Sequence, residues 1–431
     1  MADVSKEPTK AWITVFAGTS VNLCLGILYA WSIWKSALVN TKLAGTVMTG
    51  TNAGWTYITN AQAATPYTLC IIIFALLMIP GGRIQDKYGP KTGAIVGGLF
   101  LAVGCIIAGL MKSYTGLVIG FGIFGGIGMG IGYAAPTPAA LKWFGPHKRG
   151  MVAGLVVSGY GGAALYVAPL GKYLMASYGI TGSFVGLGLL FAVVVCVAGQ
   201  LLHTPPEGYV PPMKEQSSGN TTAQATTNWE PSEVMKTWQL PALICMFMMT
   251  TQSGLLIIGN ANGILKDVGK GIPFLAANAW LIVAFGGLIN ASGRIGTGMY
   301  SDKIGRLNAY CLNLGVSAIC LFCLPMIIAA KSVVLLFLAI GIAYWQYGGG
   351  LSLLPSFTAD FYGPKNLGFN YGLVFLGWGF GAFVPRLAGT IEDITGSLNY
   401  AFYLSGALLI AGIILARVTK RPDYEKTINK A

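Results

Sequence analysis

The chain has 431 residues, of which 54% are hydrophobic and only 10% are charged, and its formal net charge is +13. A soluble domain carries about 25% charged residues, so this composition excludes an ordinary soluble protein with a solvated surface. The positive charge does not indicate nucleic-acid binding, because the basic residues fall mostly in short polar segments and tails, where membrane topology explains them.

Apolar stretches of about 20 residues recur along the whole sequence, which is the length needed to cross a hydrocarbon core ~30 Å thick. The sequence predicts an all-α membrane protein with twelve transmembrane helices in two pseudo-symmetric six-helix bundles. The predicted spans are, in chain order, 11–38, 59–80, 93–112, 114–141, 150–176, 181–203, 238–262, 271–299, 308–330, 333–358, 367–392 and 397–418. A polar, proline-rich linker, 204–236, separates an N-terminal half, 1–203, from a C-terminal half, 237–431, which ends in a cytoplasmic tail.

Charge counts predict the orientation. Twelve spans place both termini and the linker on one side of the membrane, and eighteen of the 27 Lys and Arg residues fall on that side, against seven on the other. The more basic side is the cytoplasmic one. We therefore expect a multi-pass protein of the cell (inner) membrane with cytoplasmic N- and C-termini. The first ten residues are polar and the first apolar stretch is long, so no cleavable signal peptide is expected.

Two short motifs occur once in each half. GRIQDKYG at 82–89 follows the second span and MYSDKIGR at 299–306 follows the eighth, so that the two aspartates are 216 residues apart. WFGPHKRG at 143–150 and FYGPKNLG at 361–368 repeat with an offset of 218. Two motifs in register at nearly one offset indicate a duplication, and repeated halves predict alternating access around a site at their interface.

The Asp-Lys-x-Gly turn after the second and eighth spans is similar to the signature of the major facilitator superfamily, and the resemblance covers the whole chain. It implies the major facilitator fold. It also implies that Asp86 and Asp302, with the basic residues Arg83, Lys87 and Arg306, form a conformational latch of the outward-facing state rather than a substrate site. Physically, the glycine permits a tight turn between helices, and the aspartate can accept hydrogen bonds from a neighbouring helix N-terminus or a basic partner.

Arg294 is the ionisable side chain that stands out within the predicted spans. It lies eight residues before Asp302, which at about 1.5 Å per residue is roughly 12 Å from the cytoplasmic surface and close to the bilayer centre. An ionisable residue there indicates function, and a planar guanidinium suits a carboxylate. Asn290, one turn earlier, shares its face. We predict that Arg294 is unpaired and binds an anionic ligand; the alternatives are an arginine that snorkels to the interface or one that caps backbone carbonyls.

Arg386 lies near the outer end of the eleventh span, where Glu392 and Asp393 are close along the chain. We interpret it as a candidate outer gate or an arginine that snorkels to the interface, with a direct substrate contact as the alternative. The eight cysteines all fall in apolar stretches, so neither a disulfide framework nor a metal site is predicted.

A more specific resemblance extends from the first span to the twelfth. The residues Leu28-Tyr29-Ala30-Trp31-Ser32, Tyr133, Gly159-Tyr160-Gly161, Asn290-x-x-x-Arg294 and Asn370-Tyr371-Gly372 resemble the oxalate:formate antiporter and bacterial monocarboxylate transporter family. The resemblance implies that Tyr29, Tyr133, Tyr160, Asn290 and Arg294 surround the substrate, and that the arginine binds its carboxylate. Leu28, Tyr347, Phe375 and Trp378 complete the predicted substrate contacts; for the tyrosines, packing or a place in the membrane-interface belt is the alternative.

Two departures from that family refine the prediction. The oxalate antiporter has a second midplane cation, a lysine, in the eleventh span, and the matching residue here is Trp378. A dianion between one arginine and an indole is poorly compensated, so a monocarboxylate is favoured over oxalate. In the animal monocarboxylate transporters an aspartate precedes the arginine of the eighth span, and the residue here is Gly293. That route for coupling to protons is therefore missing.

The sequence thus predicts a secondary active transporter of small monocarboxylates of the lactate, pyruvate, acetate or formate type, coupled to protons or to anion exchange. A dicarboxylate (oxalate)/formate antiporter is the alternative. We expect no enzymatic activity, no cofactor and no nucleic-acid partner; the expected partners are the small anion, protons as a second candidate, and the lipid bilayer, with the monomer as the functional unit. A carrier of neutral or cationic compounds is disfavoured because no acidic residue lies in the middle of a predicted span.

Overall fold

The computed structural model describes residues 8–212, 228–277, 281–384, 387–388, 391, 395 and 397–424. Within these ranges the regular elements are helices, and strand-like pairing is limited to two isolated bridges, Val39 with Ile58 and Val47 with Thr56, after the first predicted span. The prediction of an all-α chain is therefore confirmed.

The chain folds into two compact units, which are described separately. The N-terminal unit contains the described part of Glu7–Trp143 and Gly159–Tyr209, and the C-terminal unit contains Phe144–Ser158 and the described part of Val210–Ala431. One long helix, α8 (Pro146–Gln200), thus contributes its first residues to the C-terminal unit and the rest to the N-terminal unit. The predicted division into two halves and a linker stays a prediction, because the middle of the linker, 213–227, lies outside the described residues.

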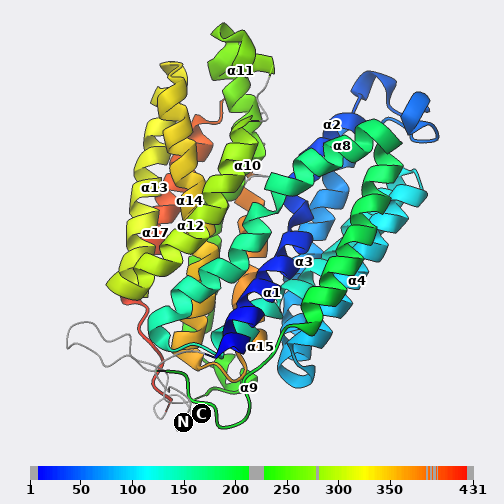
Figure 1. Ribbon diagram of the computed structural model, residues 1–431. Coiled ribbons are helices and arrows are strands. Elements are labelled where there is room, and N and C mark those ends of the chain that lie inside the picture. The colour runs from blue at the N-terminus through cyan, green and yellow to red at the C-terminus, as the bar shows by residue number, and fades with distance from the viewer. Residues whose placement is uncertain are drawn as a thin grey trace. The chain divides into compact units, whose positions relative to one another are not determined.

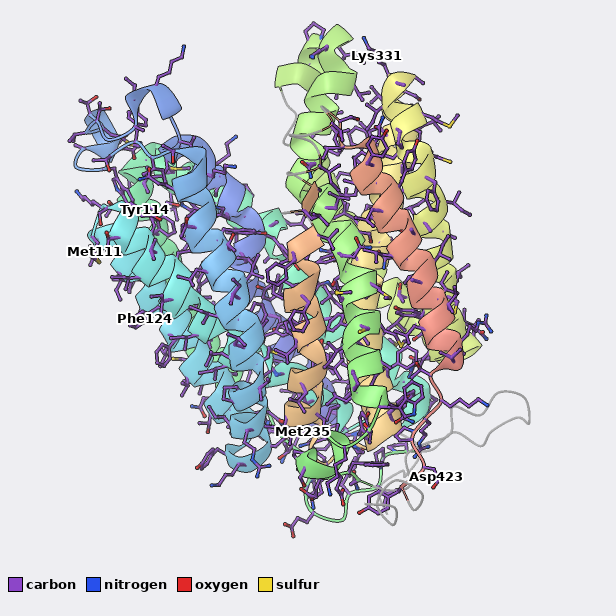
Figure 2. The ribbon with its side chains drawn as sticks, turned by 180° about the vertical axis from the view of Figure 1, so that it is seen from behind. Met111, Tyr114, Phe124, Met235, Lys331 and Asp423 are labelled. Atoms are coloured by element: carbon purple, nitrogen blue, oxygen red, sulfur yellow. The ribbon has the colours of Figure 1, made fainter. Side chains whose placement is uncertain are left out.

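The N-terminal unit is built from helices, with one longer connection, 39–59, between α2 and α3. Besides most of α8 it contains α1 (Thr9–Leu25), η1 (Gly26–Ala30), α2 (Trp31–Leu38), η2 (Thr41–Leu43), η3 (Gly50–Asn52), α3 (Asn60–Tyr88), α4 (Pro90–Leu110), α5 (Tyr114–Gly116), η4 (Leu117–Phe124), α6 (Gly125–Tyr133) and α7 (Pro136–Leu141). In Figure 2, Met111 and Tyr114 mark the end of the unit at which α4 passes into α5, and Phe124 lies further along the same helical run.

Local sequence explains where two of these helices begin and bend. α3 starts with a capping box: the hydroxyl of Thr59 accepts a hydrogen bond from the N–H of Gln62, and the Gln62 side chain accepts one from the N–H of Thr59. This pair satisfies two N–H groups that the first helical turn leaves without partners. α8 breaks at Gly179, whose φ of 71° lies in the left-handed region that glycine tolerates. The predicted spans 150–176 and 181–203 are therefore two consecutive helices.

The C-terminal unit contains the start of α8 and α9 (Pro231–Val234), α10 (Gln239–Val268), η5 (Gly269–Gly271), α11 (Pro273–Ala277), α12 (Leu281–Ile304), α13 (Arg306–Ala329), α14 (Val333–Tyr362), α15 (Leu367–Gly381) and α17 (Asn399–Val418). Figure 1 shows α10, α12, α13, α14 and α17 running alongside one another. In Figure 2, Lys331 in the turn between α13 and α14 lies at the end of the unit opposite to Met235 and Asp423. The end of the linker and the C-terminal tail therefore share one end of this unit, as the predicted topology requires.

Ten of the described helices are long and apolar enough to cross a membrane. They overlap the predicted spans one to seven, nine, ten and twelve. The other two predicted spans, 271–299 and 367–392, are covered in part by α12 and α15, and both also include residues outside the described ranges.

Both copies of the repeated Asp-Lys-x-Gly motif form the predicted tight turn. Gly89 follows α3 with a φ of 86°, and Gly305 follows α12 with a φ of 88°. A side chain at either position would place its β-carbon against the following carbonyl in this left-handed conformation. Each glycine ends the helix that carries its motif's aspartate, three residues earlier, and the next helix begins directly afterwards.

The start of α8 lies very close to α12 within the C-terminal unit. A β-carbon at Gly298 would lie 2.0 Å from the carbonyl oxygen of Gly150, and a β-carbon at Gly154 would lie 2.2 Å from the carbonyl oxygen of Arg294. Glycines at these positions let two helices approach backbone to backbone. The contact positions the backbone of α8 against the helix that carries Arg294.

We expect the substitution Gly298→Ala to lower the melting temperature of the purified protein by a few degrees, because the added methyl group forces the two backbones apart and overpacking costs about 1–3 kcal/mol. Gly315→Ala in α13 is the matched control, since its β-carbon would lie 3.8 Å from the Ile413 side chain. This second change is expected to leave the melting temperature unchanged or slightly raised. Equal melting temperatures for the two variants would contradict the close contact.

Candidate functional site

Arg294 lies on α12 and is fully buried, with 0% of its surface exposed. Its Nε donates a hydrogen bond to Oδ1 of Asn290 at 3.0 Å, and its Nη1 donates to the carbonyl oxygen of Val157 in α8 at 2.7 Å. The four-residue spacing thus brings Asn290 and Arg294 together, as the sequence predicts. The expectation that the guanidinium is unpaired is wrong, because it is bonded to a backbone carbonyl, which was the alternative interpretation.

Two glycines allow α14 to pack closely against the part of α12 that carries Arg294. A β-carbon at Gly348 would lie 2.2 Å from the carbonyl oxygen of Asn290 and 2.6 Å from its Oδ1. A β-carbon at Gly293 would lie 2.5 Å from the carbonyl oxygen of Trp345. Position 293 therefore has no room for the aspartate that precedes the arginine in the animal transporters.

Three predicted aromatic residues meet in the C-terminal unit. The indole Nε1 of Trp378, on α15, donates a hydrogen bond to the hydroxyl of Tyr347, on α14, at 3.0 Å. The ring of Phe375 lies 5.3 Å from that of Trp378, centroid to centroid. All three side chains are buried. The Tyr347 side chain packs directly against the backbone of α10 at Gly254, where a β-carbon would lie 2.3 Å from it.

The three predicted tyrosines of the N-terminal unit form one cluster. The rings of Tyr29 and Tyr160 lie edge to face at 5.3 Å, and those of Tyr133 and Tyr160 at 5.1 Å, an arrangement that aromatic quadrupoles favour. Tyr133 and Tyr160 are buried, whereas Tyr29 is partly exposed. Leu28 precedes Tyr29 in η1 and is buried.

η1 can pack against the cluster because Gly26 has no side chain. A β-carbon at this position would lie 2.4 Å from the carbonyl oxygen of Tyr160, so the contact requires glycine. Sequence reasoning missed two members of the cluster. The ring of Phe74, on α3, lies 5.5 Å from that of Tyr133 and 5.8 Å from that of Tyr160, and the Tyr160 hydroxyl lies 3.5 Å from Sδ of Met129. Met129 is one turn before Tyr133, a spacing that could have indicated the shared face; no sequence signal marks Phe74.

The second copy of the repeated motif places Asp302 against the start of α8. Its Oδ1 accepts a hydrogen bond from the N–H of Gly150 at 2.9 Å, its Oδ2 accepts one from the N–H of Met151 at 2.8 Å, and it forms an ion pair with Arg306. Burial raises the pKa of Asp302, which follows the predicted eighth span, while Arg306 and the two N–H groups oppose this shift. Arg306 also contacts Asp360, with 3.4 Å between Nε and Oδ2.

The first copy of the motif has a different partner. Oδ1 of Asp86 lies 3.7 Å from Nζ of Lys142, just beyond the fourth candidate span. Burial lowers the pKa of Lys142, and Asp86 opposes this shift. Arg83 and Lys87 are exposed, and the Lys87 ammonium lies 5.2 Å from the ring centroid of Tyr88. Of Arg83, Asp86 and Lys87, the structure therefore brings the aspartate into a partly buried ion pair.

Arg386, Glu392 and Asp393 lie outside the described residues, so the interpretation of Arg386 as an outer gate stays a prediction. Among the residues that the structure describes, no group of three or more His, Cys, Asp and Glu side chains is placed to hold a metal ion.

Comparison with known proteins identifies relatives among membrane transporters. The sequence profile of the Major Facilitator Superfamily matches residues 11–383. The oxalate:formate antiporter of Oxalobacter formigenes is 27% identical over 347 residues, covering 80% of this chain and 76% of the relative. Human monocarboxylate transporter 12 is 25% identical over 400 residues, covering 85% of this chain and 75% of the relative. An uncharacterized MFS-type transporter of Escherichia coli, YhjX, is 26% identical over 371 residues, covering 86% and 85%.

Solved structures share the fold. The proton:xylose symporter XylE superimposes with a TM-score of 0.71 at 13% sequence identity, over 99% of this chain and 100% of the other. The Escherichia coli fucose:proton symporter FucP gives a TM-score of 0.62 at 12% identity, over 96% and 97%. With the profile match over most of its length and the all-helical fold of these symporters, the chain belongs to the major facilitator superfamily of membrane transporters.

Proposed function

We propose that this transporter carries small monocarboxylates of the lactate, pyruvate, acetate or formate type by secondary active transport with alternating access. The observation that supports this proposal most strongly is the complete burial of Arg294 on α12. A buried charge in a spanning helix is expensive and indicates function, and a guanidinium binds a carboxylate through two parallel N–H···O hydrogen bonds. Asn290, bonded to Nε of the arginine, orients the guanidinium.

Trp378 favours a single negative charge on the substrate. By the resemblance, the oxalate antiporter has a lysine at the position that matches Trp378. In this chain the indole of Trp378 is buried and donates a hydrogen bond to Tyr347. A second carboxylate beside an indole would lose its hydration without gaining a cation. The alternative function, exchange of oxalate for formate, is supported by the 27% identity to the Oxalobacter formigenes antiporter.

The remaining predicted residues have supporting roles in this proposal. Tyr29, Tyr133 and Tyr160 supply hydroxyl donors, and Leu28 and Phe375 supply apolar walls for the short carbon chain of the substrate. Asp86 and Asp302, with Arg306, stabilise one conformation of the transport cycle. We place the protein in the cell (inner) membrane with both termini cytoplasmic, and the monomer as the functional unit.

Coupling follows from the charge on Arg294. A bound carboxylate neutralises the charge of the guanidinium and lowers the cost of enclosing it, whereas the hydrogen bonds to Asn290 and to the carbonyl oxygen of Val157 leave that charge in place. This favours exchange of one anion for another, or movement of a proton with the anion. Because Gly293 leaves no room for an aspartate beside the arginine, proton coupling would need another group.

Uptake by proteoliposomes tests the proposal. Vesicles containing the purified chain are expected to accumulate labelled lactate, pyruvate, acetate or formate, and unlabelled monocarboxylate trapped inside should accelerate uptake by counterflow. Comparing an imposed pH gradient with a trapped anion distinguishes proton coupling from exchange. Uptake and counterflow of oxalate, with none of the monocarboxylates, would replace the proposal by the alternative function. Transport of neither class would exclude both functions.

A further inference from the structure

A groove with a volume of about 560 Å³ runs between α12 and α14 in the C-terminal unit. α12 contributes Phe285 and Ile289, one turn apart, and α14 contributes a stripe of residues three or four apart, Val334, Leu338, Ile342 and Trp345. This α12–α14 groove is open to its surroundings, since Val334 and Leu338 are 72% and 57% exposed. Apart from Gly341, every residue that lines it has an aliphatic or aromatic side chain. The groove therefore suits a hydrocarbon chain.

The packing of the two helices sets the shape of the groove. Gly341 has no side chain, and a β-carbon there would lie 3.2 Å from the ring of Phe285. That ring packs edge to face on Phe337, with 5.2 Å between centroids, and forms one wall. Further along, a β-carbon at Gly296 would lie 2.5 Å from the indole of Trp345. α12 and α14 therefore come together at Trp345, where the groove ends.

The length of the groove matches one leaflet of a bilayer. Trp345 lies twelve residues after Val333, the first residue of α14, which at 1.5 Å per residue is about 18 Å. Half of a hydrocarbon core ~30 Å thick is about 15 Å. One end of the groove thus lies at the membrane surface and the other near the bilayer centre. Figure 2 shows Lys331 at the surface end, opposite to Met235 and Asp423.

Positive groups lie at this surface end. Lys331, in the turn before α14, is exposed, and within the described part of the chain its ammonium has no hydrogen-bond or ion-pair partner. Lys112, 219 residues earlier in the corresponding turn of the other half, instead donates from Nζ to the carbonyl oxygen of Ala53 at 3.4 Å. The N–H groups of Val333 and Val334 lie in the first turn of α14, where a helix supplies no acceptor. Together these donors suit an anionic group.

We propose that the α12–α14 groove binds an anionic phospholipid, with one acyl chain between the helices as far as Trp345 and the phosphate beside Lys331. The chain gains dispersion contacts from the walls of the groove. One lysine at the membrane surface strengthens the binding of an anionic lipid by about 5-fold. A zwitterionic lipid offers the same chain but carries its own cation, so Lys331 selects between the two. This site is separate from Arg294, and the inference does not depend on the transported substrate.

The test uses the full-length chain in detergent with phosphatidylglycerol that carries a photoreactive diazirine near the end of one acyl chain. After illumination, mass spectrometry of peptides is expected to find the label at Ile289, Ile342 or Trp345. Unlabelled phosphatidylglycerol should prevent labelling there at a concentration about 5-fold lower than phosphatidylcholine with the same chains. Glycerol 3-phosphate, which has the phosphate without the chains, should not compete.

Two pairs of variants separate the headgroup from the chain. Lys331→Gln is expected to keep the label and lose the 5-fold preference for phosphatidylglycerol, whereas Lys112→Gln, which removes the same charge from the corresponding turn, keeps both. Leu338→Trp fills the groove and should lose the label. Leu335→Trp is its control, since Leu335 is 48% exposed on the same helix but does not line the groove, and it should keep the label.

The wild-type chain alone can overturn the inference, whether or not the variants fold. Label spread outside 285–289 and 333–345 would indicate an adventitious lipid only. Equal competition by the two phospholipids would contradict an anionic headgroup, as would competition by glycerol 3-phosphate alone. Among folded variants, an unchanged preference in Lys331→Gln or an undiminished label in Leu338→Trp would also overturn it.

Discussion

Replacing Arg294 by alanine is expected to reduce the initial rate of monocarboxylate uptake by about 30-fold or more. Removing one partner of a buried charged pair costs about 2–5 kcal/mol, and each 1.4 kcal/mol is a factor of ten. The substrate carboxylate would enter a fully buried position with no cation to replace its hydration. Arg294→Lys is expected to restore less than about a tenth of the rate, because an ammonium offers no planar fork. Uptake of labelled lactate into proteoliposomes with matched protein content measures both variants.

The control for this prediction is Lys365→Ala, which also removes one positive charge from the C-terminal unit. Lys365 is exposed, with 65% of its side chain accessible, and its partner is Glu230 at 3.2 Å. An exposed ion pair contributes about 0–1 kcal/mol, so this variant should transport at the wild-type rate. Melting temperatures of all three variants show whether they are folded. Uptake by a folded Arg294→Ala protein at more than about a third of the wild-type rate would refute the assigned role.

The helices and their turns could be predicted from the sequence because both follow from local chemistry. The lipid bilayer requires apolar helices that are long enough to cross it, and such stretches are visible in a sequence. Ten of the twelve predicted spans overlap described candidate spans. Gly89 and Gly305 mark turns because few other residues adopt their φ values of 86° and 88°. Asn290 and Arg294 could be paired because one helical turn separates them.

The partners of these residues could not be predicted, because they depend on backbone groups of other helices. The acceptor of Nη1 of Arg294 is the carbonyl oxygen of Val157, and every residue has such a carbonyl. The two repeated aspartates show the same limit. Asp302 binds the N–H groups of Gly150 and Met151, whereas Asp86 pairs with Lys142. An identical local motif therefore acquires different partners from its surroundings.

The substitution Trp378→Lys is expected to change the preferred anion from a monocarboxylate to oxalate. A lysine ammonium about 4 Å from the second carboxylate of a dianion gains about 4 kcal/mol at an effective dielectric constant of 20. Desolvation of the two charges cancels much of this gain. A net increase of about 10-fold or more in the ratio of oxalate to lactate affinity is therefore expected. Competition of each unlabelled anion against labelled lactate or oxalate uptake measures this ratio.

Trp378→Leu isolates the effect of the charge. Both substitutions remove the indole hydrogen bond to Tyr347 and the ring contact with Phe375, so both should lower the melting temperature, and the leucine variant should keep the wild-type order of preference. A folded Trp378→Lys protein with the same oxalate-to-lactate ratio as Trp378→Leu would show that position 378 does not select the charge of the substrate. In that case the preference has to come from other residues, and the difference from the oxalate antiporter at this position says nothing about the charge of the substrate. A changed ratio in the lysine variant alone would show that the side chain at position 378 selects between a monocarboxylate and a dicarboxylate in this protein.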